Sequence, residues 1–204
     1  MENIRNIIFD LGGIFIQLDF SKTDDAFKQL GLPNFADFFN QHHSSPLFED
    51  LETGRINEEQ FYSAFRQAAG LKAADVEIKD AWNAMLLDFP KERLSWLKNI
   101  SQKYKVYLFS NTNIIHYKAF QNIFQENTGR QNFDEYFIKA YYSHDMGMRK
   151  PDPASFEKIL KNENLVASET LFIDDTPKNI EGAKSVGLRA ILLQSPKTVC
   201  DLEL

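Results

Sequence analysis

The stretch Ile7-Ile8-Phe9-Asp10-Leu11-Gly12-Gly13 constrains the fold more than any other part of the chain. An apolar run ends there in a carboxylate, and two glycines follow almost at once. A short apolar run bounded by turn residues is typical of a strand buried on both faces of a parallel sheet. Ligands collect at the carboxyl ends of such strands, where Asp10 stands. Taken alone, Asp10 fits either a reactive carboxylate or a hydrogen-bonded structural one.

The length and charge of the chain exclude several classes of protein. Its 204 residues suffice for one domain with a substantial core, or for a core domain with a smaller insertion. The 29 acidic residues exceed the 23 basic ones, and the basic residues form no block, which argues against nucleic-acid or membrane-surface binding. No apolar run approaches the ~20 residues that span a bilayer, and no signal-peptide pattern opens the sequence. We expect a cytoplasmic protein that is a monomer or a weak dimer.

Residues from about 21 to 97 have the pattern of an almost entirely helical segment without a strand. Helices are expected over 23–30, 57–70, 75–87 and 90–101, and Phe35, Phe38 and Phe39 recur at helical spacing between the first two. The expected helix at 57–70 opens with a capping box. His42 and His43 are expected on a helix, where adjacent side chains point apart and make a poor metal pair. We interpret this segment as an insertion after the first strand.

From Lys105 onward the pattern changes to strands that alternate with helices. Strands are expected over 106–109, 137–142, 171–173 and 189–193. Such alternation predicts an α/β fold, a doubly wound parallel sheet with right-handed crossovers. Three strands end in polar residues, which are Asp10, Ser110-Asn111 and Asp174-Asp175. Because the carboxyl ends of parallel strands share one edge, we expect these groups to converge.

The residue types at this edge point to phosphate chemistry. Three carboxylates in one cleft repel one another unless a cation lies among them. Oxygen ligands suit Mg²⁺, which binds one or two protein carboxylates and pairs with a substrate phosphate. A serine hydroxyl and the ammonium of Lys150 complement the phosphate itself. The residues therefore predict a Mg²⁺-dependent site for a small phosphate ester, with a carboxylate in position to attack.

Four motifs in order and spacing resemble those of the haloacid dehalogenase superfamily. They are Phe9-Asp10-Leu11-Gly12-Gly13, Ser110-Asn111-Thr112-Asn113, Gly147-Met148-Arg149-Lys150-Pro151 and Phe172-Ile173-Asp174-Asp175. Within the superfamily the chain resembles small bacterial sugar-phosphate phosphatases, such as α-glucose-1-phosphate phosphatases, which share the second and third motifs. The resemblance implies a Rossmann-like core over 1–16 and 93–204 and a helical cap over 17–92. It also implies a phosphatase acting on a small phosphorylated metabolite, such as a sugar phosphate.

The resemblance assigns the catalytic roles to four residues. Asp10 is implied as the nucleophile, which forms an aspartyl-phosphate that water later hydrolyses. Ser110 and Asn111 are implied to hold the phosphoryl oxygens, and Lys150 to offset the charge between nucleophile and phosphate.

The resemblance also assigns the metal ligands. Asp10, the backbone carbonyl of Gly12 and Asp175 are implied to bind Mg²⁺. Asp174 is implied either as a further ligand or as a partner behind the ligands.

One departure from the family pattern affects the chemistry. Many family phosphatases carry an acid–base aspartate two residues after the nucleophile, where this chain has Gly12. General acid–base help is worth ~10²–10⁴-fold in rate. We therefore expect leaving groups that need little protonation, such as anomeric sugar phosphates or acyl phosphates, or a proton supplied by the cap. Glu52 and Arg55 are candidates to meet the substrate from the cap.

Two alternatives remain open at this point. A 2-haloacid dehalogenase uses the same nucleophile without a metal, and a non-catalytic relative binds phosphate or a protein without turnover. The Asp174-Asp175 pair favours a metal and hence a phosphate ester. His116 and His144 lie near the motif loops. Either is a candidate to touch the substrate, although we expect hydrogen-bonded loop histidines.

Overall fold

The computed structural model describes residues 3–40 and 43–204, and within them a five-stranded sheet forms the centre of the molecule. Its strands are, in chain order, β1 (Asn6–Phe9), β4 (Lys105–Ser110), β5 (Lys139–Tyr142), β6 (Thr170–Asp174) and β7 (Arg189–Leu192). Their order across the sheet is β5-β4-β1-β6-β7, and all neighbours are parallel. In the register, Phe9 lies opposite Leu108 and Ile173, so the residues that follow these strands reach one edge together.

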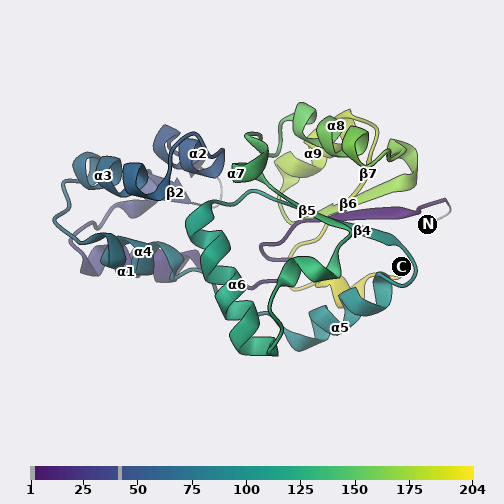
Figure 1. Cartoon of the computed structure of the whole chain (residues 1–204), viewed down its shortest axis with the longest axis horizontal. Coiled ribbons are helices and arrows are strands. Elements are labelled where there is room, and N and C mark those ends of the chain that lie inside the picture. The colour runs from purple at the N-terminus through teal and green to yellow at the C-terminus, as the bar shows by residue number, and fades with distance from the viewer. Residues whose placement is uncertain (1–2, 41–42) are drawn as a thin grey trace.

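Helices cover both faces of this sheet, as the doubly wound expectation requires (Figure 1). The helices beside the sheet are α5 (Lys91–Ile100), which precedes β4, and α6 (Ile114–Thr128), α7 (Ser143–Met146), α8 (Pro153–Asn162) and α9 (Pro177–Ser185), which follow later strands. Short 3₁₀ turns are η2 (Phe133–Tyr136), η3 (Ala167–Glu169) and η4 (Val199–Asp201). One hydrophobic cluster joins Ile7 and Phe9 to α5 and α6, and another joins Ile8 to α8 and α9. Alternate residues of β1 thus point to opposite faces and anchor both layers. The α/β prediction is confirmed.

A second set of elements lies at the carboxyl edge of the sheet (Figure 1). These elements are α1 (Phe20–Gln29), η1 (Phe35–Asp37), β2 (Phe39–Asn40), β3 (His43–Ser44), α2 (Pro46–Glu52), α3 (Glu58–Ala69) and α4 (Asp75–Asn83). We call them the helical unit. They share a hydrophobic cluster that includes Phe27, Phe48, Phe65 and Trp82 and is separate from the two clusters of the sheet. Most of the phenylalanines of this segment therefore pack against one another rather than face a ligand.

The helical unit differs from the sequence expectation in three places. The expectation of no strand is wrong, because β2 and β3 form a short antiparallel pair in which Asn40 lies opposite His43. His43 is consequently not on a helix, and His42 lies outside the described residues. The helix expected over 75–87 ends at Asn83, since Leu86 leaves the helix to bridge Leu18 in the connection from β1.

The starts of α3 and α8 agree closely with the sequence. The capping box at Asn57 is confirmed, with the Asn57 side chain accepting from the backbone N–H of Gln60. Asp152 is the N-cap of α8, and Pro153 opens that helix. At both positions the chain supplies a side-chain acceptor where the first turn has free N–H groups.

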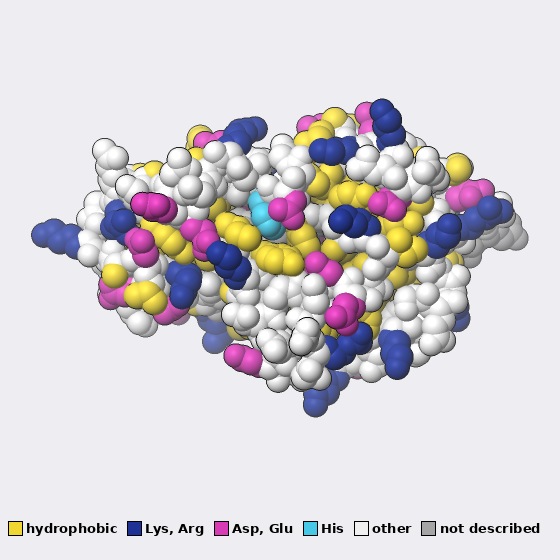
Figure 2. All heavy atoms as spheres, viewed as in Figure 1, with side chains coloured by type: hydrophobic (Ala, Val, Ile, Leu, Met, Phe, Trp, Pro, Cys, Tyr) yellow, Lys and Arg dark blue, Asp and Glu magenta, His cyan; other side chains and the backbone are white. Residues whose placement is uncertain are grey.

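Charge and hydropathy at the surface match the composition. Lys and Arg side chains are interspersed with Asp and Glu on the face drawn in Figure 2, without a block of one sign. Among the residues that the structure describes, no helix combines the length and the apolar character needed to cross a membrane.

Candidate active site

The carboxyl edge of the sheet brings Asp10 and Lys150 together, although 140 positions separate them in the numbering of the chain. Asp10 directly follows β1, where its backbone N–H bonds to the Ile173 carbonyl. The Lys150 ammonium lies 2.7 Å from Asp10 Oδ1 and is only 1% exposed. Burying a lysine ammonium is costly unless a carboxylate pairs with it, and Asp10 supplies one here.

Lys150 is held by both its backbone and its side chain. The side-chain amide of Asn111 donates to the Lys150 carbonyl at 2.9 Å and accepts from the Lys150 N–H at 2.8 Å. The ammonium contacts Asp174 Oδ2 at 2.7 Å in addition to Asp10. The rings of Phe109 and Phe172 lie beneath it at 5.4 and 5.5 Å. The ammonium is thus fixed against the nucleophile predicted from the sequence.

Three carboxylates meet here, as the sequence predicted. Oxygen atoms of Asp10, Asp174 and Asp175 lie within 4.8 Å of one another, which is a spacing that one cation can bridge. Asp174 is fully buried, and its oxygens accept from Lys150, from Asn179 Nδ2 at 3.0 Å and from the Thr176 N–H at 2.8 Å. Of the two roles predicted for Asp174, these contacts favour that of a partner behind the ligands.

The donor set fits Mg²⁺ in its chemistry. Asp10 and Asp175 supply hard carboxylate oxygens beside a glycine-lined backbone, which suits a cation that keeps several waters. Gly13 has φ +71°, and a Cβ built on it would lie 2.5 Å from Asp175 Oδ2. Only glycine at position 13 therefore leaves room for the Asp175 side chain against the loop after β1.

Gly12, the predicted backbone ligand, lies in the same loop. A Cβ at Gly12 would lie 2.8 Å from Leu18 Cδ1, so a methyl group occupies the space of any side chain there. Arg93 fixes the loop from α5, where its guanidinium donates to the carbonyls of Gly13 and Ile14 at 2.8 and 3.1 Å. The sequence analysis missed Arg93, since nothing in the local pattern marks it.

Burial and crowding shift the ionisation of these groups. Burial raises the pKa of Asp10 to about 7, and the charges of Asp174 and Asp175 add to the rise against the opposing charge of Lys150. Burial also raises the pKa of Asp175. Burial alone would lower the pKa of Lys150, but Asp10 and Asp174 outweigh it and the pKa is raised. The cluster therefore favours a bound cation, which stabilises the ionised carboxylates.

The two residues predicted to hold phosphoryl oxygens end β4 at the same edge. Ser110 is buried, and its hydroxyl makes a long contact of 3.5 Å to the Asn111 carbonyl. Such a weak contact leaves the hydroxyl able to turn toward a ligand. The Asn111 amide, in contrast, is engaged at both ends by the Lys150 backbone. Its side chain positions the lysine loop, a role that the sequence analysis missed.

The helical unit touches the site through Arg149, the residue before Lys150. The Arg149 guanidinium lies 3.0 Å from Glu49 Oε1 and 3.0 Å from Glu52 Oε2, both on α2. Burial raises the pKa of the Glu52 carboxyl, against the effect of Arg149. Of the two residues predicted to meet the substrate, Glu52 is buried at this junction. Arg55 pairs with Asp50 at the surface.

Both candidate histidines are packed structurally. The His116 Nε2 lies 3.1 Å from the Trp82 carbonyl, and the two rings stack with centroids 4.3 Å apart. The His144 ring packs against Tyr117 and Tyr142. The expectation of a hydrogen-bonded histidine is confirmed for His116.

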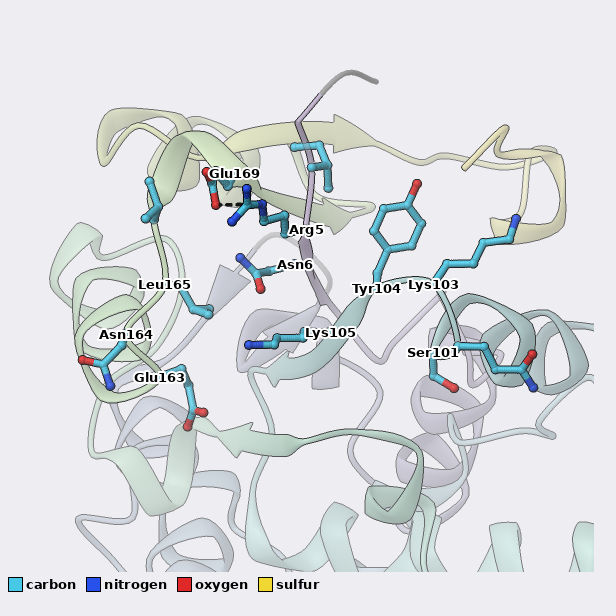
Figure 3. Close-up of a pocket in the computed structure, with 13 residues that line it drawn as sticks. Arg5, Asn6, Ser101, Lys103, Tyr104, Lys105, Glu163, Asn164, Leu165 and Glu169 are labelled. Carbon is cyan, nitrogen blue, oxygen red and sulfur yellow. Dashed lines mark ion pairs between the residues drawn. The ribbon is translucent and has the colours of Figure 1, made fainter.

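A surface pocket of about 610 Å³ lies away from this site, at the amino edge of the sheet (Figure 3). It opens between the starts of β1 and β4, where Arg5 pairs with Glu169 across its rim. Asn6 and Lys105 extend into it from the two strands (Figure 3). None of the carboxylates of the candidate site lines it.

The arrangement of these motifs agrees with a match between the chain and a known family. A family model described as haloacid dehalogenase-like hydrolase matches residues 4–187. The chain belongs to the haloacid dehalogenase-like hydrolases. The predicted family and the predicted enzyme class, a hydrolase, are confirmed.

Individual relatives of this haloacid dehalogenase-like hydrolase cover nearly all of it. D-ribitol-5-phosphate phosphatase from Bacteroides thetaiotaomicron is 30% identical over 186 residues, which are 90% of this chain and 89% of the relative. Sesquiterpene phosphatase astK from Aspergillus oryzae is 26% identical over 95% of this chain and 91% of its own. A crystal structure of a haloacid dehalogenase family enzyme from Bacteroides thetaiotaomicron, in complex with magnesium and inorganic phosphate, superposes with a TM-score of 0.86. It is 34% identical and covers 95% of this chain and 96% of that one.

Proposed function

We propose that this hydrolase is a Mg²⁺-dependent phosphatase that acts on a small phosphorylated metabolite, such as a sugar phosphate, through an aspartyl-phosphate. The observation that carries the proposal is the Asp10–Lys150 contact at 2.7 Å within a cluster of three carboxylates. The curated relatives support it, because those named above are phosphatases. The dehalogenase alternative has less support, since an anionic cluster without a cation would repel a halocarboxylate.

Asp10, Asp175 and the Gly12 carbonyl would hold the cation, with Asp174 behind them. Mg²⁺ supplies positive charge that neutralises the phosphoryl oxygens and keeps the carboxylates ionised. Hydrogen bonds from the Asn179 side chain and the Thr176 backbone N–H keep the Asp174 carboxylate oriented toward Lys150. The chain itself therefore supplies the orientation of the site.

The reaction would proceed in two displacements at phosphorus. In the first, an Asp10 carboxylate oxygen attacks phosphorus, the bond to the ester oxygen breaks, and the leaving alkoxide takes a proton to become the alcohol. In the second, a water oxygen attacks phosphorus, the bond to Asp10 breaks, and phosphate leaves as the water loses a proton. Lys150 and the Ser110 hydroxyl would bind the phosphoryl oxygens throughout.

We further propose that residues 17–92 act as the cap that closes over the cleft and excludes water. The separate hydrophobic cluster of the helical unit supports this division. Gly12 has no side chain to supply a proton, and the preference for anomeric or acyl phosphates stays a prediction. The cytoplasmic location and the monomer or weak dimer stay predictions as well.

A panel of phosphate esters, assayed with Mg²⁺ and with EDTA, tests the proposal. It includes D-ribitol 5-phosphate, glucose 1-phosphate, glucose 6-phosphate and p-nitrophenyl phosphate. We expect phosphate release that EDTA abolishes and that Asp10→Asn loses, while the exposed Asp25→Asn keeps wild-type rates. Activity that survives in Asp10→Asn, or chloride release from a 2-haloacid without metal, would overturn it. Faster turnover of glucose 6-phosphate than of glucose 1-phosphate would refute the predicted leaving-group preference alone.

A further inference from the structure

Within the described part of the chain, the side-chain amide of Asn113 is hydrogen-bonded through its oxygen but not through its nitrogen. Asn113 is the N-cap of α6, where its Oδ1 accepts from the backbone N–H groups of Ile115 and His116, each at 3.0 Å. Only an oxygen can accept both bonds, so the amide orientation is determined and Nδ2 points away from the helix. The side chain is buried at 1% exposure, and Nδ2 has no hydrogen-bond partner among the described residues. Native proteins rarely leave a buried donor in this state.

Asn113 lies between the carboxyl end of β4 and the first turn of α6. It lies three residues beyond Ser110, where the chain turns from the catalytic edge into α6. Ile115 belongs to the hydrophobic cluster of the helical unit, and the His116 ring stacks on Trp82 of α4. Asn113 therefore lies between Ser110 and the helical unit, and under the proposed function the leaving group of a bound ester would extend toward this unit.

Two further buried polar atoms without partners among the described residues lie at the end of α4. In the part of the chain that the structure describes, Trp82 Nε1 and Asn83 Oδ1 are buried without hydrogen-bond partners. Both residues end α4, the helix that packs on α6. A hydroxyl group both donates and accepts, so a ligand with several hydroxyls can satisfy donors and an acceptor together. An apolar alcohol would leave all of them unpaired.

We propose that Asn113 is a specificity-determining residue that donates a hydrogen bond from Nδ2 to a hydroxyl oxygen of the leaving group. The site then takes phosphate esters of polyols or sugars and disfavours those of apolar alcohols. This inference rests on the proposed phosphatase function and adds the chemical class of its substrate. It also separates the chain from a relative such as the sesquiterpene phosphatase, whose name specifies an apolar skeleton.

Asn113→Ser provides the test, because serine keeps an N-cap oxygen and removes the NH₂ group. The kcat/KM is measured for each hydroxylated ester that the wild type hydrolyses and for p-nitrophenyl phosphate, which has no aliphatic hydroxyl. We expect about a three- to tenfold loss on the hydroxylated esters, mainly in KM, and a change within about twofold on p-nitrophenyl phosphate. Asn57→Ser, the same exchange at the N-cap of α3, should leave both values unchanged and controls for the change from an amide to a hydroxyl at an N-cap.

Each other outcome rejects the inference. An equal loss on both kinds of ester would mean that Asn113 contacts the phosphoryl group or only supports α6. An unchanged kcat/KM on the hydroxylated esters would mean that water satisfies Nδ2. Hydrolysis of p-nitrophenyl phosphate and apolar esters without any hydroxylated one would reject the inference and leave the phosphatase function intact. The absence of hydrolysis on the whole panel would reject the proposed function itself.

Discussion

Replacing Arg149 with methionine tests how the helical unit is held at the carboxyl edge of the sheet. Methionine keeps most of the aliphatic stem, so the change removes the charge more than the packing. Two carboxylates of α2 lose their partner, Glu49 at 48% and Glu52 at 8% side-chain exposure. The exposed pair is worth about 0.5 kcal/mol. Removing the partner of a buried charge costs about 3–5 kcal/mol of stability. Because Arg149 is itself 28% exposed, water can reach Glu52 in the variant, so we expect a cost at the lower end of this range.

We therefore expect Arg149→Met to lower the free energy of unfolding by about 3 kcal/mol. The matched control is Arg55→Met, which removes a contact of the same 3.0 Å length between an arginine at 66% and Asp50 at 39% exposure. That exposed pair should cost about 0.5 kcal/mol. Urea unfolding followed by circular dichroism measures both values by linear extrapolation.

A double variant isolates the buried charge as the cause. Arg149→Met combined with Glu52→Gln leaves no buried ionised group in the junction, since the remaining Glu49 is 48% exposed, and should recover at least half of the lost stability. Equal losses in Arg149→Met and Arg55→Met would refute the reasoning. So would a double variant no more stable than Arg149→Met alone.

Three further changes follow from the geometry of the site. Gly13→Ala forces a Cβ to within 2.5 Å of Asp175 Oδ2 at φ +71°, so we expect a loss of about 1–3 kcal/mol in urea unfolding. Because Asp175 is displaced, the Mg²⁺ concentration that gives half-maximal activity should rise. Asn111→Ala frees the backbone of Lys150, and steady-state kinetics should show kcat lowered about 10- to 100-fold with a smaller change in KM. Burial lowers the pKa of His116 from 6.5 to about 4, so the unfolded chain binds the proton first and stability falls as pH drops through that window. The loss amounts to about 3 kcal/mol, and the difference in unfolding free energy between wild type and His116→Gln should show it as a function of pH.

The sheet and its catalytic edge could be predicted because both follow from local signals. Apolar runs such as Val106–Phe109 identify buried strands, and the residue types that end them identify the edge where ligands bind. The helix starts at Asn57 and Asp152 could also be predicted, since capping depends on side chains within one turn. These signals do not depend on the rest of the fold.

Features that depend on distant contacts could not be read from the sequence. The β2–β3 pair has two residues per strand, too few for any periodicity. The end of α4 at Asn83 depends on the bridge between Leu86 and Leu18, which lies far back in the chain. Arg149 acquires its role only when α2 approaches, and Asn113 is visible in the sequence as a cap but not as a buried donor. The sequence therefore predicted which residues meet at the carboxyl edge of the sheet, and the three-dimensional packing shows which residues surround them.

The central claim is that the Asp10 carboxylate takes the phosphoryl group from the substrate. Acid quenching during turnover, followed by borohydride reduction and peptide mass spectrometry, measures this directly, because an acyl phosphate is reduced to the alcohol at the residue that carried it. We expect the reduced side chain at position 10 in the wild type with Mg²⁺ and substrate, and at no position in Asp10→Asn. A label at another residue, or steady turnover in Asp10→Asn, would contradict the account.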